Sequence, residues 1–239
     1  MTKSKQATNN AKHIGIVACS AAGSAFYYKT VCAEATQVMG EHMHPEITMH
    51  TYPLGMYEGF ISSGNWAEVA NLMLSSVKKL ALAGADFAVC PDNTIHQAFD
   101  LVVKESPIPW LHIAKIVAKE AKSLGYKKLA VLGTKNLMTG PVYSEQLKKS
   151  GISFEIPDKE DRETLNQIVF NELAKGTFTE PSRLYLNKLI QELKDRGCDG
   201  AALACMELPM LVDPADCPLP TLDPTTLLAK AAIKEALEV

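Results

Sequence analysis

The sequence predicts an α/β protein with two pseudo-symmetric lobes, each built on a parallel sheet flanked by helices. Short apolar runs typical of buried strands alternate with longer segments of helical spacing. This alternation runs through the chain twice, and parallel strands joined by helices need right-handed crossover connections. Two stretches that begin alike, Gly84-Ala85-Asp86 and Gly197-Cys198-Asp199, indicate that the second round repeats the first.

The first round opens with an apolar run that leads into the small residues Ser20-Ala21-Ala22-Gly23. Strands are expected at 13–19, 47–52 and 85–90, and helices at 24–39, 66–84, 95–104 and 111–124. The segment 53–64 carries three glycines and is expected to form a long loop of the kind that covers a binding site.

The second round has the same rhythm. Strands are expected at 128–132, 152–156 and 201–205, and helices at 143–149, 161–173, 182–196 and 225–237. The sequence therefore suggests an N-terminal lobe of residues 1–105 with 209–239, and a C-terminal lobe of residues 106–208.

The composition is that of an ordinary globular protein. A net charge of -3 gives no reason to expect nucleic acid or a membrane surface as a partner. No run approaches the roughly 18 apolar residues of a membrane helix, and the first twelve residues carry no apolar signal core. The six cysteines show no disulfide framework or zinc spacing, so we expect a cytoplasmic protein with reduced thiols and no metal.

Two polar positions follow predicted strands at the same distance from the repeated glycines. Asp92 comes eight residues after Gly84, and Cys205 comes eight residues after Gly197. In open parallel sheets, ligands bind beyond the carboxyl ends of the strands. We therefore expect an active site between the lobes, with Asp92 contributed by one lobe and Cys205 by the other.

Two proton-transfer groups on opposite sides of a small substrate suit racemisation or a related isomerisation. One group removes a proton from one face of a carbon, and the other returns a proton to the opposite face. An aspartate is ionised at neutral pH, whereas a cysteine acts as a base only as the thiolate. Asn93, Thr94 and Thr134 would hold a substrate carboxylate and stabilise the enolate-like charge that develops.

Each position also has a purely structural interpretation. A strand-end cysteine is usually a small buried hydrophobic residue, and Asp92 or Asn93 would cap the helix that follows. The identical register of Asp92 and Cys205 favours function. Glu207 fits equally well an acid that serves the site and a cap for a short turn before Pro209.

These residues resemble the aspartate/glutamate racemase family, the amino-acid racemases that work without pyridoxal phosphate. The resemblance runs from about Ile14 to Leu211 and includes the segment FISSGNWAEVANLML, the box from Asp92 to His96, the turn LGT at 132–134 and the block GCDGAALACMELPML. It implies two lobes with the site between them, usually in a homodimer. It also implies a small carboxylate substrate and no cofactor.

The family pattern can be carried over residue by residue. The family has a cysteine at both catalytic positions, whereas this chain keeps Cys205 and has Asp92 at the other; Cys90 is not expected to substitute. Asn93, Thr94 and Thr134 match its carboxylate-binding positions. Ser20, Lys175 and Glu207 complete the predicted substrate-binding set, and Lys175 resembles the lysine that meets the distal carboxylate of aspartate or glutamate.

Three features depart from the family pattern. Ser20-Ala21-Ala22 replaces glycine–methionine–glycine in the first loop, and Met206 and Leu137 stand where threonines are usual. The segment 53–64 has no arginine to match a dicarboxylate.

The leading hypothesis is a cofactor-independent racemase or isomerase of a small carboxylate, most simply aspartate or glutamate. A second is a one-cysteine enzyme that resembles the arylmalonate decarboxylase or maleate isomerase branches. A third is a binding protein without catalysis.

Overall fold

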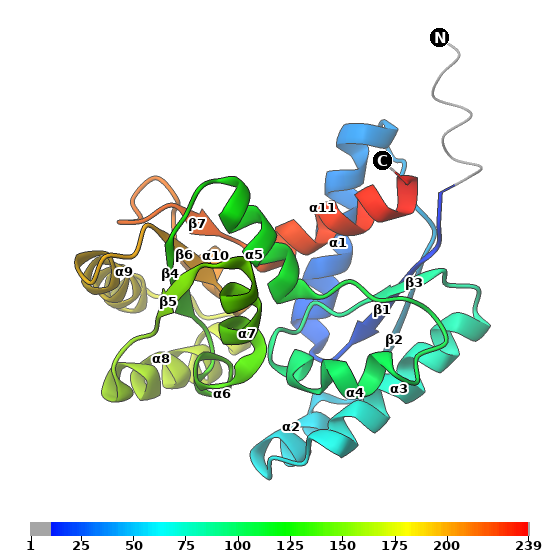
Figure 1. Cartoon of the computed structure of the whole chain (residues 1–239), viewed down its shortest axis with the longest axis horizontal. Helices are drawn as coiled ribbons and strands as arrows, with labels where there is room; N and C mark the ends of the chain where they lie inside the picture. Colours follow the sequence, from blue (N-terminus) through cyan, green and yellow to red (C-terminus); the bar gives the residue numbers. More distant parts are fainter. Residues whose placement is uncertain (1–10, 239) are drawn as a thin grey trace. The chain divides into compact units, whose positions relative to one another are not determined.

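The computed structural model describes residues 11–238 and confirms an α/β chain with two parallel sheets flanked by helices (Figure 1). The chain divides into an N-terminal and a C-terminal unit, with boundaries between Ile113 and Ala114 and between Pro224 and Thr225. Within the described range, no helix has the length and apolar character needed to cross a membrane.

Both boundaries fall later in the chain than the sequence suggests, and strand pairing explains the difference. Trp110 forms a parallel bridge to Ala88, which ties the segment before Ile113 to the first sheet. Strand β7 (Thr221–Leu222) pairs with β6 (Gly200–Leu203), which ties the segment before Thr225 to the second sheet. Helix α5 (Ile113–Ser123) consequently belongs to the C-terminal unit from Ala114 onward, and α11 (Pro224–Leu237) belongs to the N-terminal unit from Thr225 onward.

The first sheet has the strand order β2-β1-β3, and all its pairs are parallel. Its strands are β1 (Ile14–Ala18), β2 (Ile47–Thr51) and β3 (Phe87–Val89). Every residue of β1 is buried, as its unbroken apolar run predicts for a central parallel strand. Figure 1 shows α1 (Ala21–Met39) and α11 on one side of this sheet, and α3 (Trp66–Leu82) and α4 (Phe99–Val103) on the other.

The prediction of a loop at 53–64 is wrong, because this segment contains helix α2 (Leu54–Ser62). Tyr57 is completely buried, and Phe60 and Ile61 pack against the core that α3 helps to form. This spacing gives α2 one apolar face, which outweighs the low helix propensity of its glycines. The φ of +69° at Gly64 then suits the end of the helical segment.

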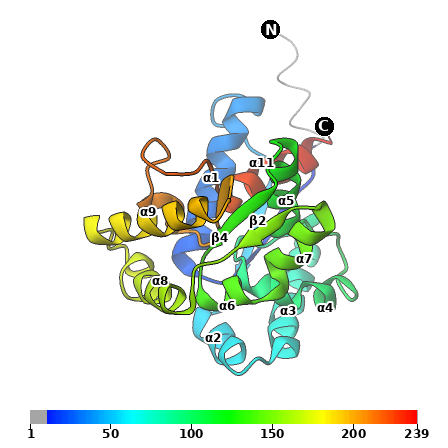
Figure 2. The same cartoon turned by 60° about the vertical axis from the view of Figure 1, so that its left-hand side comes forward.

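The second sheet has the order β5-β4-β6-β7, again with parallel pairs throughout. Strand β4 (Lys128–Leu132) has the predicted bounds. Strand β5 (Ser153–Glu155) is one residue shorter at each end than predicted. Figure 2 shows α8 (Lys159–Asn171) and α9 (Glu180–Asp195) together on one side of β4, and α7 (Pro141–Ser150) on the other. Four short elements were not predicted: α6 (Lys135–Thr139), η3 (Leu173–Lys175), α10 (Leu208–Leu211) and β7.

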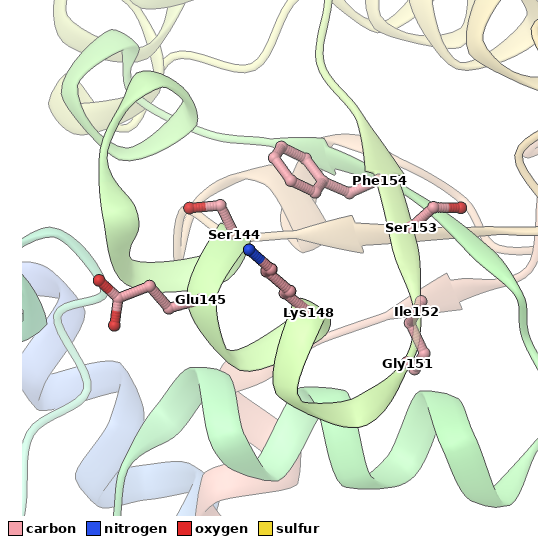
Figure 3. A pocket seen from close by; sticks show the side chains of 7 residues that line it. All are labelled: Ser144, Glu145, Lys148, Gly151, Ile152, Ser153 and Phe154. Atoms are coloured by element: carbon pink, nitrogen blue, oxygen red, sulfur yellow. The ribbon is translucent and has the colours of Figure 1, made fainter.

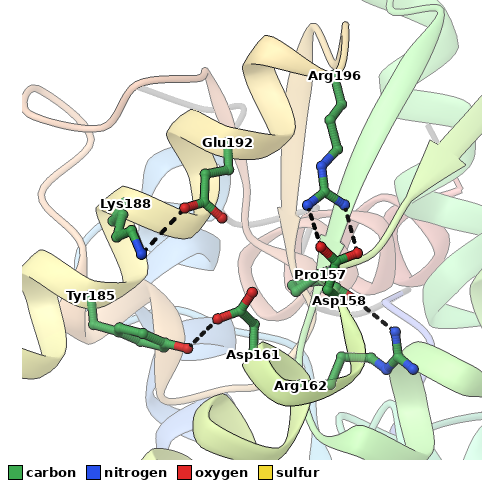
Figure 4. A network of polar contacts seen from close by, with 8 residues as sticks. All are labelled: Pro157, Asp158, Asp161, Arg162, Tyr185, Lys188, Glu192 and Arg196. Atoms are coloured by element: carbon green, nitrogen blue, oxygen red, sulfur yellow. Dashed lines mark hydrogen bonds and ion pairs between the residues drawn. The ribbon is translucent and has the colours of Figure 1, made fainter.

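A polar network fixes α9 against the start of α8 (Figure 4). Arg196, just after α9, donates two hydrogen bonds of 2.8 and 3.1 Å to the carboxylate of Asp158. The Tyr185 hydroxyl donates to Asp161 at 2.7 Å, and Arg162 donates to the carbonyl of Pro157 at 2.6 Å. The bidentate Arg196–Asp158 geometry specifies how the two helices pair more than a single contact would.

Candidate active site

Each sheet has an aspartate at the amino end of its strands that accepts hydrogen bonds from a neighbouring strand. Asp86 accepts a hydrogen bond of 2.7 Å from the backbone N–H of His13, just before β1. Asp199 accepts bonds of 2.7 Å from the N–H of Lys127 and 3.1 Å from that of Lys128, at the start of β4. These aspartates belong to the repeated Gly-x-Asp stretches, so the repeat has a structural basis in each unit.

Asp92 lies three residues beyond the end of β3 and is half-buried. Its Oδ1 accepts hydrogen bonds from the N–H groups of Thr94 at 2.9 Å and Ile95 at 3.2 Å. These N–H groups open the 3-10 helix η2 (Thr94–Ala98), so the cap interpretation of Asp92 is correct. Two N–H donors also stabilise the ionised carboxylate, which is the form that a base requires.

The main chain of Asp92 is held by a histidine. The Nδ1 of His96 lies 2.7 Å from the Asp92 carbonyl oxygen, and its Nε2 lies 3.4 Å from the N–H of Ile113. Burial, followed by the neighbouring His112, lowers the pKa of His96 to about 3. The sequence box contained His96, but residue type and spacing alone assigned it no role.

Two buried thiols lie behind Asp92 and remain protonated. Complete burial, and then the Asp92 charge, raises the pKa of Cys90. Burial, followed by the nearby Asp92 and Cys90, raises the pKa of Cys19. Cys90 is part of the apolar core, so the geometry agrees with the expectation that it does not substitute at position 92.

The remaining predicted residues of the N-terminal unit also lie at strand ends. Ser20 is at the N-cap position of α1, where its side chain makes no capping bond, and its buried hydroxyl has no hydrogen-bond partner among residues 11–238. Asn93 is buried and Thr94 is half-buried, directly after Asp92. Strands β1 and β3 are paired in parallel, so their carboxyl ends are neighbours.

The C-terminal unit brings two strand ends into close contact. A Cβ placed on Gly133, after β4, would lie 3.0 Å from the carbonyl oxygen of Ala204, after β6. Only glycine allows this approach. Thr134 and Cys205 follow these two residues directly, so they occupy adjacent positions. Thr134 caps α6, and its Oγ1 accepts a bond of 3.3 Å from the N–H of Leu137.

Cys205 has a carboxylate as its side-chain partner. Its Sγ donates to Oε2 of Glu207 at 3.0 Å, and both residues are half-buried. Glu207 stands at the N-cap position of α10 but its side chain makes no capping bond there. Of the two roles that the sequence left open for Glu207, the side-chain cap is not the one observed, and a role in the active site stays a prediction.

Lys175 is less closely connected. It is the last residue of η3 and is exposed. Its neighbour Leu173 packs in the same core as Leu208 and Leu211, which follow Cys205 in the chain. The two apolar departures from the family pattern, Leu137 and Met206, are buried. They contribute to packing within the C-terminal unit.

A shallow pocket of about 650 Å³ lies elsewhere in the C-terminal unit, between α7 and the edge strand β5 (Figure 3). Its lining residues are Ser144, Glu145, Lys148 and the segment 151–154. None of the predicted site residues lines it. Among the described residues, no three His, Cys, Asp or Glu side chains are placed to hold a metal ion.

Comparison with known proteins identifies the class to which this fold and these strand-end residues belong. The model of the Asp/Glu/Hydantoin racemase family matches residues 14–232. The chain belongs to this family, and the prediction of a racemase-type enzyme is confirmed at that level.

Individual relatives agree with this assignment. The broad specificity amino-acid racemase RacX of Bacillus subtilis (strain 168) is 25% identical over 171 residues, which is 71% of this chain and 73% of RacX. A structure described as a putative Asp/Glu racemase from Yersinia pestis is 30% identical, with a TM-score of 0.88 over 95% of this chain and 99% of that one. An aspartate racemase homologue from Pyrococcus horikoshii OT3 is 26% identical, with a TM-score of 0.83 over 94% and 99% of the two chains.

Proposed function

We propose that the protein is a cofactor-independent racemase of a small carboxylate, most simply aspartate or glutamate. In this proposal Asp92 and Cys205 exchange protons with the α-carbon from opposite faces. The observation that carries it is the Cys205–Glu207 contact, in which a thiol donates to a carboxylate at 3.0 Å. A two-base racemase needs one protonated and one ionised group, and Cys205 and Asp92 fit these two states.

The direction of proton transfer follows from the two environments. Asp92, whose Oδ1 accepts from two N–H groups, removes the α-proton from one face and becomes a carboxylic acid. Cys205 gives its thiol proton to the other face and becomes a thiolate. The inverted product leaves an enzyme with a protonated Asp92 and an ionised Cys205. The original state returns when a proton moves from Asp92 to Cys205, either through solvent or by the reverse reaction.

The carboxylate of the substrate is assigned to Asn93, Thr94 and Thr134. Hydrogen bonds from these groups would also stabilise the charge that spreads onto the carboxylate when the α-proton leaves. Ser20, Lys175 and Glu207 complete the proposed binding set. Lys175 would meet a second carboxylate, which is the reason to test aspartate and glutamate first. The specificity of RacX is a reason to include neutral amino acids.

The experiment is proton exchange in D₂O, followed by ¹H NMR and by chiral separation. Each enantiomer of aspartate and glutamate, together with a panel of neutral amino acids, is incubated with the enzyme. We expect the α-proton signal to disappear while the opposite enantiomer accumulates carrying deuterium. Asp92→Asn is the sharpest variant, because the asparagine oxygen still accepts from Thr94 and Ile95 but is no longer a base. A two-base racemase loses nearly all turnover in this variant.

One observation favours a second candidate function. Oδ1 of Asp92 already caps η2, so Asp92 would be an orienting group in an enzyme with a single working thiol. Cys205 would then protonate an enediolate, as in a decarboxylase, or attack an unsaturated acid. The same Asp92→Asn variant separates the two, because a one-thiol enzyme keeps much of its activity. Cys205→Ala abolishes both activities and serves as the background.

Two further expectations accompany the proposal. A homodimer is the assembly that the family resemblance implies, and sedimentation of the purified chain measures it directly. A cytoplasmic location is expected from the sequence, and cell fractionation tests it.

A further inference from the structure

We propose that His96 is the positioning residue of Asp92 and holds its carboxylate in the orientation for proton transfer. This inference rests on the proposed function and adds to it a residue that would not contact the substrate. It depends on how the main chain turns after β3, which is followed by Asp92, and after β6, which is followed by Cys205.

The backbone carbonyls of Cys205 and Asp92 accept hydrogen bonds from different kinds of donor. In the C-terminal unit the Cys205 carbonyl accepts a hydrogen bond of 3.1 Å from the N–H of Leu208, three residues later. The matching donor for Asp92 is the N–H of Ile95, but this group is used by the Asp92 carboxylate at 3.2 Å. The Asp92 carbonyl is bonded by side chains instead: the ring of His96 donates to it at 2.7 Å, and the thiol of Cys90 makes a longer contact of 3.8 Å.

The partners of the ring fix its protonation. A carbonyl oxygen can only accept and a backbone N–H can only donate, so Nδ1 of His96 carries the proton and Nε2 accepts from Ile113. Only the neutral ring makes both bonds. The ring is 3% exposed and stacks on Phe99, with centroids 5.6 Å apart and planes 10° apart. His112 lies against it with a centroid distance of 4.9 Å. Because the ring is enclosed in this way, its Nδ1–H has a fixed direction.

Hydrogen bonds consequently hold the Asp92–Asn93 segment at both its main chain and the Asp92 side chain. The carbonyl is held by His96, Oδ1 is held by Thr94 and Ile95, and the N–H of His96 bonds back to the carbonyl of Asn93 at 3.3 Å. Without the imidazole donor, the Asp92 carbonyl loses its short hydrogen bond and keeps the weak 3.8 Å contact with the Cys90 thiol, so the peptide between Asp92 and Asn93 is held less firmly. The Asp92 carboxylate and the Asn93 side chain would then change direction together, and a small misalignment of a reacting group slows a reaction strongly.

The test compares four variants of the full-length protein. His96→Asn keeps a donor near the Nδ1 position, whereas His96→Gln places its amide near Nε2, and His96→Leu removes both functions. Phe99→Leu is the matched control, because Phe99 contacts the His96 ring without a hydrogen bond. We expect kcat for the exchange reaction to fall about tenfold or more in His96→Leu and His96→Gln, with KM changed less than threefold. His96→Asn and Phe99→Leu should stay within about threefold of the natural chain.

A second readout does not depend on activity. Hydrogen exchange of the Thr94 and Ile95 amides reports whether the Asp92 cap is still in place. It should speed up in His96→Gln and His96→Leu but not in His96→Asn, while the Leu208 amide stays unchanged in all variants. Unchanged kcat and unchanged exchange in His96→Gln would overturn the inference. Should His96→Leu not fold, the Asn and Gln pair still decides it. If the natural chain turns over no substrate, the proposed function fails, and the amide readout still tests the positioning.

Discussion

The thiol of Cys205 lies 3.0 Å from the carboxylate of Glu207, only two residues further along the chain. The turn between β6 and α10 makes this contact possible, because it points both side chains the same way while Met206 between them is buried. In this geometry the sulfur is the donor and the carboxylate oxygen is the acceptor, so the shared proton lies on Cys205. Such a thiol is suited to begin a reaction as the acid.

Glu207→Gln is therefore expected to make Cys205 more reactive toward alkylation at neutral pH. Loss of the negative charge beside the sulfur is expected to raise the labelling rate several-fold. The measurement is the rate of iodoacetamide labelling at Cys205, followed by mass spectrometry. Cys198 is the internal control, because burial raises the pKa of its thiol to about 11. A slower reaction at Cys205 in the variant would contradict this interpretation and would assign Glu207 the role of a base.

Gly133→Ala is expected to destabilise the protein by about 1–3 kcal/mol. The new Cβ would lie 2.6 Å from Cδ2 of Leu137, which can move, and 3.0 Å from the carbonyl oxygen of Ala204, which is backbone. The strain falls between the residues that directly precede Thr134 and Cys205, so activity should drop as well. Gly55→Ala is the control, because its Cβ meets no atom within 4 Å and α2 gains helix propensity. Urea unfolding of both variants gives the comparison.

His96 makes the stability of the protein sensitive to mild acid. Its pKa is about 3 in the folded protein and about 6.5 in an unfolded chain, so the unfolded state takes up a proton first as the pH falls. Stability is complete above pH 6.5 and is lost progressively toward pH 3. Between pH 7 and pH 5 the loss from His96 alone is about 2 kcal/mol. His96→Asn should lack this part of the pH dependence in urea unfolding, and an identical slope in the two proteins would refute the assignment.

Asp199→Asn is expected to destabilise the C-terminal unit by about 1–2 kcal/mol. The two carboxylate oxygens accept from two successive N–H groups, at Lys127 and Lys128, and an asparagine has only one oxygen to offer. Asp195→Asn is the matched control, since Asp195 is exposed and accepts a hydrogen bond from the Gln191 side chain. Its unfolding free energy should change by less than about 0.5 kcal/mol. Equal effects of the two substitutions would show that the strand anchor contributes nothing.

Much of the fold could be predicted because the local signals agree with one another. Buried parallel strands need unbroken apolar runs, and amphipathic helices need a periodic apolar face, so β1, β4, α3 and α9 were all expected near their observed positions. The Gly-x-Asp repeat could also be recognised in the sequence, because the glycine that ends a helix and the aspartate that precedes a strand lie within three residues of each other. Counting from that repeat led to Asp92 and Cys205.

Other features depended on contacts between distant segments. Helix α2 was missed because its glycines suggest a loop, whereas the burial of Tyr57 decides its structure. The unit boundaries were misplaced because the pairing of Trp110 with Ala88 and of β7 with β6 has no local signature. The bonding of His96 was hidden for the same reason, since the Ile113 amide that bonds its Nε2 is seventeen residues away.

The sequence by itself determined the α/β class, the repeat and the two strand-end positions at which an aspartate and a cysteine stand. Short-range periodicity and residue chemistry are enough for these. Only the tertiary structure decided that Glu207 contacts Cys205 and that His96 holds Asp92. Both interactions depend on the direction of side chains after a turn, and that direction is set by packing around the turn.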